Sequence, residues 1–378
     1  MYVLDHFAFE AIHSSRWMTL FPLLVLYAGL SVFVFSVTPL FRGMVPQVGF
    51  LLLATLHPQL LMWGNTIRWY GWWTGLALIT LTVALQPGST KVRPDFTYAR
   101  AVTIGLLLTC LFYINYITLV FGVALGAAMI LRYSLSRWKQ YLVSIAIVTI
   151  LVIPQLHAFL YVHTKGSPDQ RSSLLLSTAR LVEATLFSEA YLPWHPLAIA
   201  GAVLFLLLLV AVAYRAFLLT RTQSLTAILR EYNQLGSVIL FAVLFFGLVV
   251  LTGLGGKPRN GLILVPVLAP VFALAFDSLQ SRRLQSVVLI FYIFWSAIGI
   301  THLLRRQGLA KSSMINKPEE VTSYIKGASG ADCSVVFTYD ALLGLTLSNS
   351  DLQPLLILMP FQNAIYQQGK HPFSVHDC

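Results

Sequence analysis

The chain contains 378 residues, of which 57% are apolar and only 10% are charged, and it carries a formal net charge of +11 at pH 7. So few charges exclude an ordinary water-soluble fold of this length, and apolar stretches of helical length recur where a membrane barrel would show short alternating strands. The sequence therefore predicts an all-α polytopic membrane helix bundle. Its Lys and Arg residues lie in short loops between apolar stretches, which indicates membrane topology and excludes nucleic acid as a partner.

The chain opens on an amphipathic segment, residues 1–13, which we expect to lie as a short helix in the membrane interface. No secretory signal pattern precedes the first apolar stretch. The apolar stretches that follow are expected to form the membrane helices: 17–41, 46–56, 69–85, 101–131, 141–162, 197–219, 237–254, 262–276 and 287–304.

The stretch 101–131 is about twice as long as one short span requires, at roughly 1.5 Å per residue and a hydrocarbon core near 30 Å. It can form one tilted helix or two short helices that turn at 113–116. Basic residues flank both of its ends, and the positive-inside rule places basic loops in the cytoplasm. Both ends then lie on the same side of the membrane, which favours the helical hairpin.

The distribution of basic residues predicts which loops lie inside the cell and which lie outside. The loops expected inside hold Arg42, Lys91, Arg93, Arg100, Arg132, Arg137, Lys139, Arg215, Arg221, Arg230, Arg282 and Arg283. The segments expected outside are 57–68, 163–195, 257–260 and the tail after Leu304.

The composition of the chain turns soluble near its end, so we divide it into a transmembrane domain, residues 1–304, and a small domain, residues 305–378. Residues 317–325 resemble a helix start, with Pro and two acids in the first turn, and 334–338 and 354–359 resemble buried strands. We expect a small C-terminal α/β appendage outside the membrane.

The most informative segment is the turn at residues 57–73, HPQLLMWGNTIRWYGWW. The His57-Pro58 step ends one apolar helix, and Arg68 stands at the start of the next. A cation at the membrane is costly and is usually retained for a ligand or a partner charge, and the helices beside Arg68 offer no carboxylate. We therefore expect Arg68 to bind a ligand, and we assign the surrounding tryptophans to the interfacial aromatic belt.

Several short motifs together resemble the GT-C glycosyltransferases, in particular the branch of rhizobial galacturonosyltransferase-like and protein-mannosyltransferase-like enzymes. The resemblance is carried by Arg16, His57-Pro58, Arg68-Trp69-Tyr70, the stretch 113–116, and Lys257-Pro258-Arg259-Asn260 with Pro266. It covers most of the chain from Met1 to about Leu304. It implies a multi-pass protein of a bacterial inner membrane with its C-terminal tail in the periplasm.

The resemblance also implies an activity, the transfer of a sugar from a polyprenyl-phosphate donor lipid to a glycan, lipid or protein acceptor. Such a site needs cations at headgroup depth for the leaving phosphate, and Arg suits phosphate through its bidentate fork. We expect the donor phosphate to be bound by Asn65, Arg68, Tyr70, Lys257 and Arg259. The acceptor or sugar is expected at His57, Trp194 and His195.

A carboxylate that activates the acceptor hydroxyl is harder to assign. Members of the family usually carry it in an outward loop after one further span, and that loop would lie upstream of Met1. Within this sequence the catalytic candidates are Asp5, Glu10 and Glu189, and the other outward acids are Asp169 and Glu183. The acid that often precedes Arg68 in the family, the His at the hairpin centre and the Tyr after the late Arg are replaced here by Asn65-Thr66, Asn115 and Asn260.

These departures leave a second hypothesis open, a non-catalytic donor-binding or scaffold subunit of the same fold that works with a partner subunit. A transporter is less favoured because no paired repeats with broken helices are visible. No side-chain metal site is expected, since His371, His376, Asp377 and Cys378 lack zinc spacing. A divalent metal ion is the one cofactor that the resemblance allows, and membrane lipids are the remaining partner.

Overall fold

The computed structural model describes residues 15–41, 43–64, 69–86, 95–165, 173–188, 196–222, 233–279 and 281–305. Nearly all of them belong to one compact unit, which extends from Thr19 to Ala310. The predicted interfacial helix at 1–13 and the predicted α/β appendage at 305–378 lie outside the described residues, apart from the helical end at Arg305.

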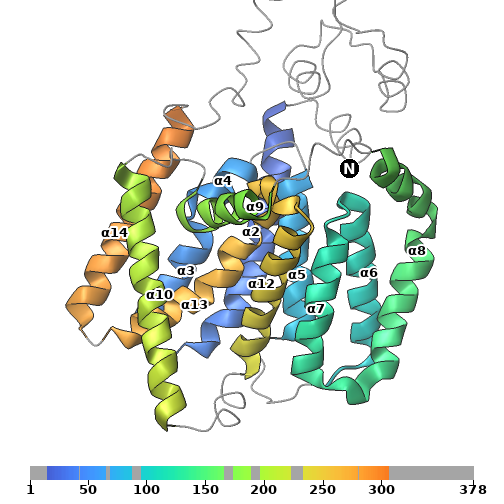
Figure 1. Ribbon diagram of the computed structural model, residues 1–378, viewed down its shortest axis with the longest axis horizontal. Helices are drawn as coiled ribbons and strands as arrows, with labels where there is room; N and C mark the ends of the chain where they lie inside the picture. The colour runs from blue at the N-terminus through green and yellow to red at the C-terminus, as the bar shows by residue number, and fades with distance from the viewer. Residues whose placement is uncertain are drawn as a thin grey trace, which may run out of the picture. The chain divides into compact units, whose positions relative to one another are not determined.

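Every regular element in the described part is helical, which confirms the predicted all-α bundle (Figure 1). The helices are α2 (Ser15–Val37), α3 (Met44–Thr55), α4 (Pro58–Gly64), α5 (Trp69–Leu85), α6 (Tyr98–Ile114), α7 (Thr118–Tyr133), α8 (Trp138–Lys165), α9 (Leu174–Val182), α10 (Pro196–Thr222), α12 (Asn233–Leu251), α13 (Leu264–Ser278) and α14 (Arg282–Arg305). Short helical turns include η1 (Thr38–Leu40), η2 (Leu135–Arg137), η4 (Glu183–Phe187), η5 (Leu254–Gly256) and η6 (Pro258–Gly261).

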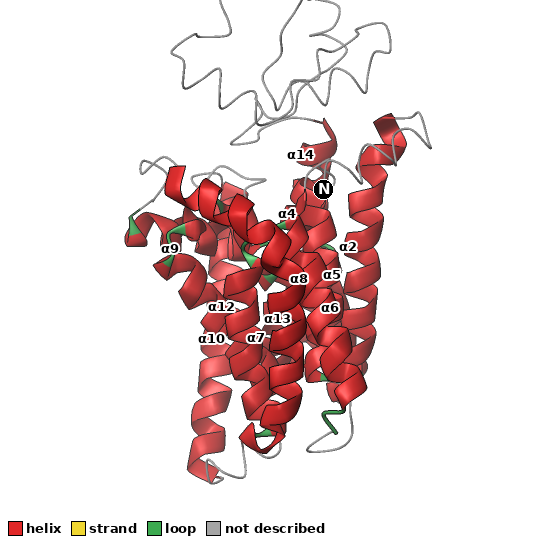
Figure 2. Cartoon of the chain, turned by 90° about the vertical axis from the view of Figure 1, so that its right-hand side faces the viewer, coloured by secondary structure: helices red, strands yellow, loops and turns green. Residues whose placement is uncertain are grey.

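Six helical stretches in the described part are long and apolar enough to cross a membrane, as expected of a multi-pass membrane protein. They are Leu20–Leu40, Met44–Gly64, Leu135–Leu156, Pro196–Leu218, Gln234–Leu251 and Arg282–Leu303. Four shorter apolar helices, α5, α6, α7 and α13, pack among them (Figure 2).

The stretch 101–131 forms the helical hairpin α6–α7, as predicted. Asn115 ends α6 in an extended conformation, and its side-chain Oδ1 accepts a hydrogen bond from the Ile117 amide at 2.8 Å. The Thr118 hydroxyl donates to the Asn115 carbonyl at 2.7 Å and accepts from Trp73 Nε1 at 2.9 Å. Asn115 thus serves the turn itself, and Trp73 ties the tip of the hairpin to α5.

Apart from α4 and α9, which lie at one end, successive helices run in opposite directions, so the bundle has two ends with different contents (Figures 1 and 2). One end carries α4, α9, η4, η5, η6 and the last turn of α14, and we call it the HP end after the His57-Pro58 step. The other end carries the last turns of α5 and α7 and the first turns of α6, α8 and α14, and we call it the basic end. The described parts of the segments predicted to lie together outside the cell all fall at the HP end.

Glycines let α2 and α5 approach at backbone distance. A Cβ atom on Gly75 would lie 2.2 Å from the Val25 carbonyl oxygen, and one on Gly29 would lie 2.2 Å from the Gly75 oxygen. Small residues at such positions allow close helix packing where lipid supplies no hydrophobic driving force. This contact holds the start of α5, and with it Tyr70, against the first span.

Two expectations are corrected by the structure. The segment 163–195 was expected to be a loop, but its middle forms α9, whose Ser177 and Leu181 are buried. Arg132 was counted as a loop cation, but its side chain is fully buried, and it donates from Nε to the Leu85 carbonyl at 3.0 Å.

Candidate functional site

The His57-Pro58 step separates α3 from α4 because proline cannot continue the first helix but suits the first turn of the next. His57 is only 2% exposed, and its Nδ1 accepts a weak hydrogen bond from the Gln59 amide at 3.3 Å. Its ring lies 5.6 Å from the ring of Trp295 on α14 and 6.4 Å from that of Phe205 on α10. The structure therefore places His57 among aromatic side chains inside the bundle, and its role toward an acceptor stays a prediction.

The best-defined feature of the HP end is a guanidinium held over two aromatic rings. Arg259, on η6, places its Cζ atom 5.3 Å from the ring centroid of Trp63 and 5.2 Å from that of Tyr70. The two rings meet edge to face at 5.3 Å and are almost fully buried. Among the described residues, the Arg259 side chain forms no hydrogen bond or ion pair, so its N–H donors are available to a ligand.

The turn that carries Arg259 is fixed by its own residues. Gly253 takes a left-handed φ of 73°, which ends α12 and starts the turn. Asn260 Nδ2 donates to the Leu254 carbonyl at 2.9 Å, and this side chain is only 7% exposed. Asn260 therefore holds the turn closed. Lys257 is exposed just ahead of η6.

The segment formed by α9 and η4 packs against this turn (Figure 1). A Cβ on Gly255 would lie 3.0 Å from the Ser177 carbonyl oxygen, so α9 and η5 touch through backbone. Further along, the Ser188 hydroxyl donates to Gln59 Oε1 at 3.2 Å, and both side chains are about 1% exposed. Ser188 has a φ of +67°, a strained conformation for a residue with a side chain.

The hydrogen bond between Ser188 and Gln59 joins residues 129 positions apart in the chain. It therefore brings the segment that leads into Glu189 to the HP turn, as the predicted common side requires. The turn Glu183–Phe187 has π-helical hydrogen bonding, a local feature that is frequent at functional sites.

Among the described residues, Glu183 is the one carboxylate at the HP end, because Asp95 and Asp277 lie at the basic end. Glu183 lies on η4, which packs directly against η6. Within the described ranges, no group of three or more His, Cys, Asp or Glu side chains could hold a metal ion.

The structure brings together two of the predicted donor residues, Tyr70 and Arg259, with Lys257 on the same turn. Seven predicted site residues lie outside the described residues: Asp5, Glu10, Asn65, Arg68, Glu189, Trp194 and His195. Sequence reasoning assigned Trp63 to the membrane belt and did not single out Gln59 or Ser188. Only the apolar stretch in LLLSTARLVEATLF, residues 174–187, could have indicated that a packed helix precedes Ser188.

Comparisons with protein-family models, curated proteins and solved structures find no match to this chain. Its function is therefore inferred from the residues at the HP end.

Proposed function

We propose that this chain is a membrane glycosyltransferase that moves a sugar from a polyprenyl-phosphate donor to an acceptor at the outer face of the inner membrane. The observation that supports it most is the Arg259 guanidinium, held over Trp63 and Tyr70 at the end of a membrane bundle with its donors available. A polyprenyl chain stays in the bilayer while its phosphate lies at the surface. A cation at that depth, beside apolar spans, suits such a donor.

The chemistry requires two kinds of group from the protein. The leaving phosphate needs positive charge, which Arg259 and Lys257 supply and to which Arg68, one residue before α5, is expected to add. The acceptor hydroxyl needs a base, which takes its proton as the oxygen attacks the anomeric carbon and the phosphate departs. Glu183 is the described candidate for this base, beside the sequence candidates Asp5, Glu10 and Glu189.

The donor site can be tested by binding of a polyprenyl phosphate to purified protein. Arg259→Ala should weaken binding by on the order of 2 to 5 kcal/mol if the charge pair is desolvated, and Arg68→Ala should act alike. Arg259→Lys should restore binding only in part, since Lys lacks the fork. Arg221→Ala is the matched control, because Arg221 lies over the Phe217 ring at 4.4 Å at the basic end. Unchanged binding in the Arg259 and Arg68 variants would remove this assignment.

A non-catalytic donor-binding or scaffold subunit is the second candidate, favoured by the single described carboxylate at the HP end. Transfer from donor lipid to total membrane acceptors separates the two. If the chain is an enzyme, the wild-type protein should transfer sugar, and replacing the residue that acts as the base should lower the rate about a hundredfold to ten-thousandfold. The variants to compare are Glu183→Gln, Asp5→Asn, Glu10→Gln and Glu189→Gln. Donor binding without transfer by the wild-type chain would support the scaffold.

The orientation is part of the same proposal, with the HP end and the C-terminal tail in the periplasm. Single cysteines can be introduced at Ser173 for the HP end and at Ser136 for the basic end in a background without native cysteines; both positions are exposed. In intact cells an impermeant maleimide should label Ser173→Cys and leave Ser136→Cys unlabelled. The reverse pattern would invert the topology.

A further inference from the structure

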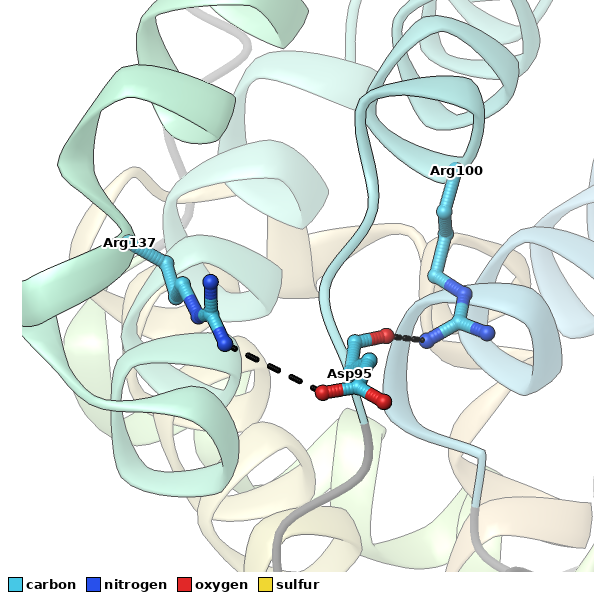
Figure 3. A network of polar contacts seen from close by, with 3 residues as sticks. All are labelled: Asp95, Arg100 and Arg137. Atoms are coloured by element: carbon cyan, nitrogen blue, oxygen red, sulfur yellow. Dashed lines mark hydrogen bonds and ion pairs between the residues drawn. The ribbon is translucent and has the colours of Figure 1, made fainter.

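The basic end contains a charged corner made of Asp95, Arg100 and Arg137 (Figure 3). Asp95 lies just before α6, between two arginines that come from different elements. Arg100, in the first turn of α6, donates from Nη1 to the Asp95 backbone carbonyl. Arg137, at the end of η2, places its Nη2 3.8 Å from Asp95 Oδ1, and the two side chains are 48% and 69% exposed. The two guanidinium groups therefore approach Asp95 from opposite sides (Figure 3), and both arginines are at least partly exposed.

Positive charge is in excess at this corner. Asp95 is the only acid in the sequence from 95 to 165, whereas Arg100, Arg137 and Lys139 all lie at least partly exposed around it. The ion pair with Arg137 is long and solvated, and such pairs contribute little. Arg100 donates to the Asp95 backbone carbonyl and is also hydrogen-bonded to the Tyr133 side chain, and among the described residues no carboxylate forms an ion pair with it. Arg132, beneath them, is committed to the carbonyls of Leu85 and Gln86.

Apolar side chains at the same corner are exposed. Trp138 is 55% exposed and Leu135 is 64% exposed, and the Lys139 ammonium lies 5.9 Å from the Trp138 ring centroid. Exposed Trp beside Lys and Arg is typical of the depth at which headgroups meet acyl chains. The spans place this end at a membrane surface, so a soluble anion would leave Trp138 and Leu135 without a partner, whereas a lipid would cover them.

We propose that this corner binds the headgroup phosphate of an anionic phospholipid. Arg100 and Arg137 bind the phosphodiester, and Trp138 and Leu135 contact the acyl chains. Basic pockets between membrane helices on the cytoplasmic side are suited to such headgroups. The lipid phosphate replaces the carboxylate of Asp95 as the partner of Arg137. The site is independent of the donor site, because it lies at the opposite end of the bundle.

The test is native mass spectrometry of the delipidated full chain titrated with phosphatidylglycerol or phosphatidylcholine. Wild-type protein should bind the anionic lipid more tightly than the neutral one. Each of Arg100→Gln and Arg137→Gln should weaken phosphatidylglycerol binding about fivefold, from ~1 kcal/mol per cation near an anionic surface. The double variant Arg282→Gln/Arg283→Gln is the matched control, since it removes two exposed arginines from the start of α14 at the same end. It should keep the preference.

Asp95→Asn gives the result that a purely structural network would not produce. Removing the competing carboxylate should tighten phosphatidylglycerol binding a few-fold, although it breaks the ion pair with Arg137. Glycerol phosphate in solution should not displace the lipid. Equal binding of the two lipids, equal loss in the α14 control, weaker binding by Asp95→Asn, or displacement by glycerol phosphate would each overturn the proposal.

Discussion

The two ends of the bundle each hold an arginine in apolar surroundings, and the two are held in different ways. Arg132, at the basic end, is fully buried and donates to the carbonyls of Leu85, the last residue of α5, and of Gln86, which follows it. Arg259, at the HP end, lies half-buried across the faces of Trp63 and Tyr70. A guanidinium whose donors meet backbone carbonyls caps a helix, whereas one stacked on rings keeps its donors for a ligand.

The ends also differ in how far apart their residues lie in the sequence. The basic corner is built from neighbours along the chain, residues 95–100 and 132–139, with the end of α5 beneath. The HP end joins α4, the Ser188 region and η6, which lie far apart in the sequence. We therefore expect substitutions at the basic end to change mainly stability or lipid contact, and substitutions at the HP end to change ligand binding.

The largest expected difference is in stability. Arg132→Leu should lower the free energy of unfolding by about 2 to 4 kcal/mol, because the buried Leu85 carbonyl and the part-buried Gln86 carbonyl lose this donor. Arg259→Leu should lower it by less than about 1 kcal/mol, since no hydrogen bond is lost. Reversible unfolding in mixed micelles measures both. Equal destabilisation by the two variants would erase the distinction between a capping and a ligand-binding arginine.

A smaller effect is expected at the contact between α4 and the Ser188 region. Ser188→Ala should cost about 1 to 2 kcal/mol of unfolding free energy, because the buried hydrogen bond from Ser188 to Gln59 Oε1 is lost. Ser286→Ala is the control at the basic end, where an exposed hydroxyl donates to the Arg282 carbonyl at 3.0 Å, and it should change stability by less than about 0.5 kcal/mol. The idea fails if both serine variants unfold alike.

The stacking of Arg259 can be measured by a double-mutant cycle. Trp63→Leu and Arg259→Gln, alone and together, should give a coupling energy of about 1 kcal/mol, a typical value for a partly desolvated cation–π pair. The exposed pair Phe217 and Arg221 should couple by only about 0.5 kcal/mol. A coupling of zero between Trp63 and Arg259 would mean that the rings do not hold the guanidinium.

The smallest effect concerns Asp95. Asp95→Asn should change the free energy of unfolding by less than about 0.5 kcal/mol, because its ion pair with Arg137 is 3.8 Å long and both side chains are exposed. The same unfolding assay tests this. If Asp95→Asn lowered the free energy of unfolding nearly as much as Arg132→Leu, the corner would be a structural contact and not an open lipid-facing surface.

The sequence predicted the helices well because apolar length alone decides them. The stretch 69–85 is predicted and observed with the same limits. The stretch 101–131 turns at 113–116, as expected because basic residues at both of its ends place those ends on the same side of the membrane. The content of 163–195 could not be predicted as well. α9 is only 9 residues long, too short to be marked by the apolar length that predicts a span, and its leucines Leu174 and Leu175 are exposed.

The site was predicted in part. Tyr70, Lys257 and Arg259 were chosen for their chemistry, and the structure places Arg259 against Tyr70. Trp63 was taken for a membrane anchor, since an aromatic residue near a turn has the same sequence signal whether it faces lipid or a guanidinium. The acceptor role of His57 stays a prediction. Its neighbours Phe205 and Trp295 come from helices that no local pattern connects to it.

The sequence by itself determined a membrane-spanning helical chain and the order and reversal of its helices, because burial in lipid depends on composition and length. It also separated the loops that are rich in Arg and Lys from those that are not. Only the tertiary structure decided which arginine caps a helix and which is a candidate for binding a ligand. Arg132 and Arg259 carry the same charge near the ends of apolar helices, and what distinguishes them is whether carbonyls or ring faces reach them across the packed bundle.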